Sequence, residues 1–368
     1  GSIFLVNVPI VVVALIAGVF LIPTSKDPSK PPLDPVGALL SIVGLVALVY
    51  AIIQAPEKGW TSPETVGVGA FGIVVLVAFA LWERYTPSPM LDTSFWKNPR
   101  FSAASAGIML LFFAMFGSIF LLTQYLQFVM GYDALAAGIG LLPMALTMLV
   151  VAPNSPRLVE RIGTKKTVGA GLTIAGFGLA LMAMLPATDI SYWGDVAWRL
   201  IVMAIGMGLT MAPATESIMG SLPRAKAGVG SAVNDTTRQV GGALGVAIIG
   251  SVMASAFGSR VDTLFTNSGV PAEGVDVAKE GLGQAIAVAS DPRVPSSLSA
   301  QLIQGAKEAF VDGAHHGLWV AAAVALLGAA VVFKWLPARE LPAVDDPGAA
   351  IGAGRAPEAP VELETDPV

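Results

Sequence analysis

Charged residues are scarce in this chain of 368 residues. Asp, Glu, Lys and Arg make up 13% of it, whereas hydrophobic residues make up 54%. An average soluble domain carries about 25% charged residues. There is no cysteine, which excludes disulfides, thiolate zinc sites and cysteine nucleophiles. We therefore expect a membrane protein and not a soluble globular domain.

Several classes of functional motif are missing as well. No Gly-rich loop is followed by Lys and Ser or Thr in the pattern that cradles a nucleotide phosphate. The two histidines, His315 and His316, are neighbours and point to different faces of a helix, so they form no metal site by themselves. The net charge is −5, and no basic stripe lies beside stacking aromatic residues, so we expect no nucleic-acid partner. We also expect no enzyme activity and no cofactor.

Long hydrophobic runs, by contrast, are abundant. Nine of them are long enough to cross about 30 Å of hydrocarbon as helices. They lie at residues 3–22, 36–54, 65–82, 101–128, 134–153, 167–186, 197–219, 228–257 and 315–336. The first six contain no Asp, Glu, Lys or Arg, which a helix with one wet face could not sustain. The sequence therefore predicts an all-α, polytopic membrane protein with nine transmembrane helices.

Lys and Arg alternate along the connections between these runs. Basic residues follow the first, third, fifth and seventh runs: Lys26 and Lys30, then Arg84, Lys97 and Arg100, then Arg157, Arg161, Lys165 and Lys166, and then Arg224 and Lys226. The short connections between these hold only Lys58. Because basic loops stay in the cytoplasm, we expect these connections and the C-terminal tail to be cytoplasmic, in a cell (inner) membrane. Segment 258–314 would then lie outside. Residue 1 would also lie outside, which predicts that further helices precede it.

Apart from Arg199 and Lys334 at the ends of their runs, three strongly ionisable residues fall within the runs, namely Glu216, Asp235 and Arg238. Charges at membrane depth are costly, so they normally pair or face a water-filled cavity. Asp235 and Arg238 are three residues apart on one helix and can pair directly. The three residues form either a structural ion-pair network or a coupling or gating site, and the sequence leaves both open.

A half-polar patch interrupts the fourth run. Gln124, Tyr125 and Gln127 stand among Phe, Leu and Met residues, including Met115 and Phe116. Such a patch could line a cavity for a large apolar solute. Gln side chains also join helices by hydrogen bonds, so both readings remain.

Small residues and prolines mark places where helices approach closely or break. The glycines form two stripes, at Gly241, Gly242, Gly245 and Gly250 and at Gly206 and Gly208. They predict close backbone approach. Three prolines within the runs are expected to kink or break their helices: Pro143, Pro153 and Pro213.

Several short segments resemble one family of transporters. They are IFLVNVP at 3–9, YLQ at 125–127 with GY at 131–132, AG at 137–138, LP at 142–143, APATE at 212–216, and SAVNDTTRQVGG at 231–242. Together they resemble the fourteen-helix drug:proton antiporters of the major facilitator superfamily. The resemblance covers nearly the whole chain up to about residue 336.

The connection after the fifth run resembles a loop motif of the same superfamily. The family pattern is Asp-Arg-x-Gly-Arg-Lys/Arg-Lys/Arg, and this chain matches it at Glu160, Arg161, Gly163, Lys165 and Lys166. Glu replaces the Asp, and Thr164 replaces an Arg. The clamp that this loop forms between helices is therefore expected to be weaker.

The resemblance implies a domain plan and an activity. Residues 1–22 would be the last helix of the N-terminal bundle, 23–98 two extra central helices with their linkers, and 99–336 the C-terminal six-helix bundle with a long external loop at 258–314. The family exports hydrophobic, often cationic compounds by alternating access, driven by proton influx. The implied partners are a lipophilic small molecule, protons, the lipid bilayer and five earlier helices of the same protein. The alternatives are a non-transporting truncated module that binds or scaffolds, and an exporter of a lipid or siderophore.

Two connecting segments complete the prediction. Residues 299–311 have helical spacing of Leu302, Ile303, Ala306 and Phe310, which predicts an amphipathic helix that packs on the outer mouth. The tail, 337–368, is rich in Pro, Ala, Gly and acidic residues and is expected to be disordered.

Overall fold

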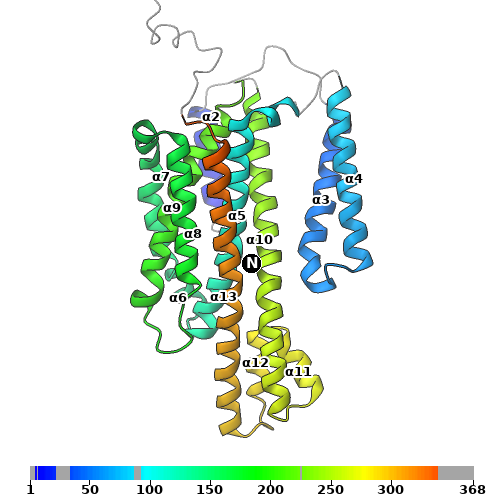
Figure 1. The fold of residues 1–368 in the computed structure, drawn as a ribbon, viewed down its shortest axis with the longest axis vertical. Coiled ribbons are helices and arrows are strands. Elements are labelled where there is room, and N and C mark those ends of the chain that lie inside the picture. The colour runs from blue at the N-terminus through cyan, green and yellow to red at the C-terminus, as the bar shows by residue number, and fades with distance from the viewer. Residues whose placement is uncertain (1–4, 6, 22–33, 87–92, 224–225, 339–368) are drawn as a thin grey trace, which may run out of the picture.

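The computed structural model of the chain describes residues 5, 7–21, 34–86, 93–223 and 226–338 (Figure 1). Every regular element in these ranges is helical. The longer helices are α2 (Asn7–Leu21), α3 (Pro35–Lys58), α4 (Pro63–Tyr85), α5 (Pro99–Gln124), α7 (Leu142–Ile162), α8 (Thr164–Met182), α9 (Trp198–Met219), α10 (Ala227–Asn267) and α13 (Ser296–Trp335). The shorter elements are η1 (Thr93–Lys97), η2 (Tyr125–Val129), α6 (Ala134–Ile139), η3 (Tyr192–Ala197), α11 (Ala272–Lys279) and α12 (Leu282–Ala289).

The predicted fold class is confirmed, since the described residues of the nine hydrophobic runs lie mainly in helices. Within the described ranges, seven helices are long and apolar enough to cross a membrane. The two remaining runs correspond to α2, with 15 described residues, and α8, with 19. The tail expected to be disordered lies outside the described residues from 339 onward.

Three helices begin with the same two-residue signal, a capping residue followed by proline. Asp34, Ser62 and Asn98 each accept a hydrogen bond from a backbone N–H in the first turn, at 2.9, 3.2 and 2.9 Å. Proline suits the next position because its missing N–H would have no partner there. These signals place the starts of α3, α4 and α5.

Close backbone contact holds the main bundle together, as the glycine stripes predict. A Cβ on Gly245 would lie 2.0 Å from the carbonyl oxygen of Phe113, and one on Gly241 would lie 2.3 Å from that of Met109. Between α8 and α9, a Cβ on Gly206 would lie 2.2 Å from the backbone nitrogen of Ala175. No side chain larger than hydrogen fits at these contacts.

Two of the three prolines do not break their helices. Pro153 and Pro213 lie inside α7 and α9, which continue through them. Pro143 lies in the first turn of α7, directly after α6 ends. A proline in the first turn is tolerated.

Segment 258–314, which the sequence predicts to be a long external loop, is largely helical. α10 continues to Asn267 and α13 begins at Ser296, and helices of 41 and 40 residues are about 60 Å long, roughly twice the hydrocarbon thickness. Their projecting parts pack with α11 and α12 around Phe257, Phe265 and Phe310, all buried. We call this unit, residues 258–314, the helical cap. The predicted helix at 299–311 exists as part of α13 and not as a separate element.

The two ends of the bundle therefore differ (Figure 1). At one end lies the helical cap. At the other lies the turn between α7 and α8, with Arg161, Lys165 and Lys166, and we call it the basic end. α3 and α4 form a hairpin beside α10, where the indole nitrogen of Trp60 donates to the Ser251 hydroxyl at 3.1 Å.

Candidate functional site

A cavity of about 530 Å³ lies between α5, α10, α3 and the turn from α11 to α12. We call it the α5–α10 cavity. Its lining residues are Ile53, Phe116, Phe120, Gln124, Gly242, Ala243, Val246, Ala247, Gly250, Met253, Ala254, Phe257, Glu280 and Gly281. Its volume lies within the range of about 300–1,000 Å³ that is typical of small-molecule sites.

The sequence creates this cavity by pairing aromatic residues with small ones. Phe116 and Phe120 are four residues apart, so they lie on one face of α5, and 46% of each side chain is exposed. Across from them, α10 offers glycine and alanine, and a Cβ on Gly250 would meet nothing within 4 Å. The walls are apolar, with polar groups only at Gln124 and Glu280.

The structure separates the five residues that the sequence grouped as a substrate cavity. Phe116 and Gln124 line the α5–α10 cavity. Met115 packs against the hydrophobic core. Tyr125 is buried, and Gln127, which is half-buried, does not line this cavity. Glu280, which does line it, was missed because it lies in a segment predicted to be a loop.

A π-helical turn at 125–129 directs Tyr125 away from the cavity. The Met130 N–H bonds to the carbonyl of Tyr125, five residues earlier, at 3.1 Å. The Tyr125 hydroxyl donates to the Pro186 carbonyl at 2.7 Å. From α13, His315 donates through Nε2 to the adjacent Leu185 carbonyl, also at 2.7 Å.

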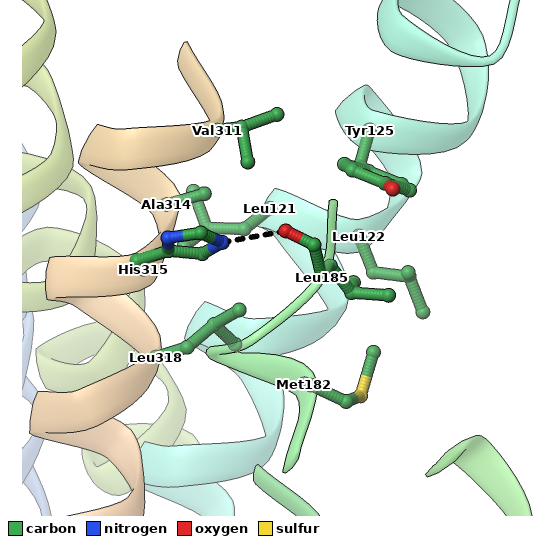
Figure 2. A pocket seen from close by; sticks show the side chains of 9 residues that line it. All are labelled: Leu121, Leu122, Tyr125, Met182, Leu185, Val311, Ala314, His315 and Leu318. Atoms are coloured by element: carbon green, nitrogen blue, oxygen red, sulfur yellow. Dashed lines mark hydrogen bonds between the residues drawn. The ribbon is translucent and has the colours of Figure 1, made fainter. Parts of the chain in front are cut away.

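Figure 2 shows these side chains around a second, smaller space. Tyr125 and His315 come from different helices, and the chain segment with Leu185 passes between them. The space that they line measures only about 10 Å³, which is room for no more than about one water molecule. Tyr125 and His315 therefore tie α5 and α13 to the connection after α8 and do not form a solute site.

In the described part of the chain, Asp235 and Arg238 do not form the ion pair that their spacing permits. Arg238 extends between α9 and α5, where Nη2 donates to the Thr215 hydroxyl at 2.8 Å and the guanidinium lies 5.2 Å from the ring centre of Phe112. Asp235 and Glu216 are exposed, and no ion pair among the described residues joins either acid to Arg238. The spacing allows a pair, but the guanidinium contacts Thr215 of α9 and Phe112 of α5 instead.

Arg238 is also incompletely satisfied. Its Nε is buried and has no hydrogen-bond partner among the described residues. A cation at membrane depth is costly unless an anion or water compensates it. Among the described residues, one hydrogen bond and one aromatic ring hold the Arg238 guanidinium.

The backbone conformation of the turn between α7 and α8, which contains the loop motif, requires the glycine at position 163. Gly163 has φ +86° and ψ 156°, a conformation that is essentially restricted to glycine. Its N–H caps α7 by bonding to the Val159 carbonyl at 2.8 Å. A Cβ there would lie 2.3 Å from the carbonyl oxygen of Ala338, just beyond α13. Glu160, Arg161 and Lys166 are exposed and Lys165 is half-buried.

Comparison with known proteins gives a consistent family. The chain is 31% identical to the multidrug efflux pump LfrA of Mycolicibacterium smegmatis over 332 residues, covering 90% of this chain and 64% of that protein. It is 29% identical to the multidrug resistance protein Stp of Mycobacterium tuberculosis over 344 residues, or 91% of this chain and 63% of Stp. The tetracenomycin C resistance and export protein of Streptomyces glaucescens is 28% identical over 333 residues, or 90% and 62%. The chain thus spans slightly less than two thirds of the length of these relatives.

A solved structure is more distant. A bacterial homolog of the human lysosomal transporter Spinster, in an inward-facing and unoccupied conformation, matches with a TM-score of 0.48 and 18% identity, over 83% of this chain and 68% of that chain. The family model of the Major Facilitator Superfamily matches residues 1–246. The chain belongs to the Major Facilitator Superfamily and is a multi-pass membrane protein.

Proposed function

We propose that this chain is part of a proton-coupled exporter of hydrophobic or cationic small molecules. The observation that carries the proposal is the α5–α10 cavity, which has the volume and the apolar walls that such a solute needs. The relatives named for multidrug efflux, multidrug resistance and antibiotic export support the same class of solute.

In this proposal the helices keep the places that the family resemblance implies. α2 is the last helix of the N-terminal bundle, α3 and α4 are the two extra central helices, and α5 to α13 form the C-terminal bundle. The basic end is cytoplasmic because of its Lys and Arg residues. The helical cap then lies on the outer side, and the two bundles rock against each other to give alternating access.

The coupling site in this proposal centres on Arg238. Its contacts with Thr215 and Phe112 hold the guanidinium between α9, α10 and α5. Glu216 and Asp235 lie on α9 and α10 and form no ion pair with it among the described residues. An exchange of protons for solute needs groups of this kind at membrane depth.

Transport by the whole protein that contains this chain tests the proposal. The protein is reconstituted into liposomes, and accumulation of ethidium is followed under an imposed proton gradient. We expect accumulation that collapses when an ionophore dissipates the gradient. Failure to move ethidium and other drugs in either orientation, from well-folded protein, would contradict the proposal and favour a non-transporting membrane module. Movement of lipid or siderophore alone would correct the solute class.

A further inference from the structure

Glu280 is the single charged residue among those that line the α5–α10 cavity. It lies at the C-terminal end of α11, where its backbone N–H bonds to the Val277 carbonyl at 3.2 Å. Its side chain is exposed. The helical cap therefore contributes a carboxylate to the rim of a cavity whose other walls belong to membrane helices.

The carboxylate of Glu280 has no partner in the part of the chain that the structure describes. The adjacent cation, Lys279, bonds instead to Asp262 at 3.1 Å and to Asp276 at 2.9 Å. These two hydrogen bonds raise the pKa of Lys279. Because Lys279 is held by two other acids, it does not neutralise Glu280.

Aromatic rings lie along the same cavity. Phe116 and Phe120 line it from α5, and Phe257 lines it from α10. The faces of aromatic rings attract cations, most strongly where water is excluded. Gln124 adds an amide whose oxygen can accept a hydrogen bond. The lining residues extend from Gly242 to Phe257, about 22 Å along α10, so the site suits an extended molecule.

We propose that the α5–α10 cavity binds lipophilic organic cations and that Glu280 selects their charge. The inference rests on the proposed function and adds to it the residue that discriminates cationic from neutral solutes. An aromatic, apolar cavity accepts the body of the solute whatever its charge. The carboxylate at the rim strengthens binding only when the solute is positive.

The test compares two aryl phosphorus ligands, the tetraphenylphosphonium cation and the neutral triphenylphosphine oxide, which has one phenyl ring fewer. Binding to the purified whole protein is measured by equilibrium dialysis of radiolabelled ligand at low salt. Glu280→Gln keeps the shape of the side chain and removes its charge. We expect the Kd for tetraphenylphosphonium to rise roughly fivefold, as the loss of one partly exposed ion pair implies, and the Kd for triphenylphosphine oxide to change less than about twofold.

Glu273→Gln is the matched control. Glu273 is another exposed acid of α11, and it does not line the α5–α10 cavity. Its substitution should leave both Kd values unchanged. Equal affinities of wild-type and Glu280→Gln protein for the cation, equal weakening for both ligands, or equal weakening by Glu273→Gln would each overturn the inference.

Proton-driven transport of a neutral drug separates this inference from the proposed function. If Glu280→Gln leaves cation binding unchanged while wild-type protein still exports the neutral drug, only the inference about Glu280 fails. If wild-type protein binds the cation through Glu280 but transports neither solute, the proposed function fails and the binding site stands.

Discussion

α10 uses glycine in two opposite ways on two of its faces. On one face, Gly241 and Gly245 press against the backbone of α5, so that an added Cβ would lie 2.3 or 2.0 Å from a carbonyl oxygen. On the other face, Gly250 meets nothing within 4 Å and leaves room in the α5–α10 cavity. In one case the missing side chain brings helices together, and in the other it keeps a space open. Sequence alone shows both as one stripe of small residues.

The face of α10 with Gly241 and Gly245, the packed face, should show the largest effect of a substitution on stability. Gly245→Ala places a methyl group against the backbone of Phe113, which cannot move aside as a side chain can, so we expect a loss of about 3 kcal/mol of stability. The apparent melting temperature of purified protein and its monodisperse yield measure the change. Gly250→Ala is the matched control and should melt like wild type. Equal melting temperatures for the two variants would remove the distinction between the faces.

Gly163 combines two demands on a glycine, a close contact and a positive φ. Gly163→Ala combines a strained positive φ with a clash against Ala338, and we expect a cost of about 2 kcal/mol. Gly131 also has positive φ, +75°, but a Cβ there would meet nothing within 4 Å. Gly131→Ala should therefore cost less in the same melting measurement. If Gly131→Ala costs as much, the contact with Ala338 contributes nothing.

Arg238 lies on the packed face of α10, nearer the basic end. A substitution there tests whether its role is structural or in coupling. Since no acid among the described residues pairs with it, Arg238→Leu leaves no unpaired buried carboxylate. We expect the melting temperature to stay within a few degrees, while proton-driven export falls about tenfold, the equivalent of 1.4 kcal/mol. Export and melting are measured on the same preparation. Unchanged export would exclude a coupling role. Loss of export together with a large fall in melting temperature would indicate a structural role.

A substitution on the face of α10 with Gly250, the open face, should change stability least and should change the binding of bulky solutes only. Gly250→Leu fills part of the cavity, so the affinity for a bulky solute should fall about threefold while that for a small one stays the same. Stability should change by less than about 0.5 kcal/mol. Dialysis with tetraphenylphosphonium and with tetramethylammonium gives the two affinities. An unchanged affinity for the bulky ion would place the solute elsewhere.

The hydrophobic runs were enough to predict the fold class and the approximate positions of the long apolar helices. They missed the helical cap because charges such as Arg260 and Asp262 end the hydrophobic run, although the spacing of Phe257, Val261 and Phe265 continues the helix. Glu280 was missed for the same reason.

The candidate site was only partly predictable. The π-helical turn that directs Tyr125 away from the cavity leaves no mark in the sequence. Likewise, the spacing of Asp235 and Arg238 permits an ion pair, and only the packing of α9 and α5 around Arg238 prevents it. Local patterns predict where polar residues occur in a membrane helix, but neighbouring helices decide which side chains meet.

The central claim is that the α5–α10 cavity holds the exported solute, and the absence of cysteine from this chain permits a direct measurement. Ala243→Cys places one thiol in the cavity, and Ser259→Cys places one on an exposed surface of the helical cap outside it. The rate of maleimide labelling is measured with and without saturating tetraphenylphosphonium. We predict that the cation slows labelling several-fold at position 243 and leaves it unchanged at position 259. Equal labelling rates with and without the cation at position 243, in protein that still exports it, would contradict the account.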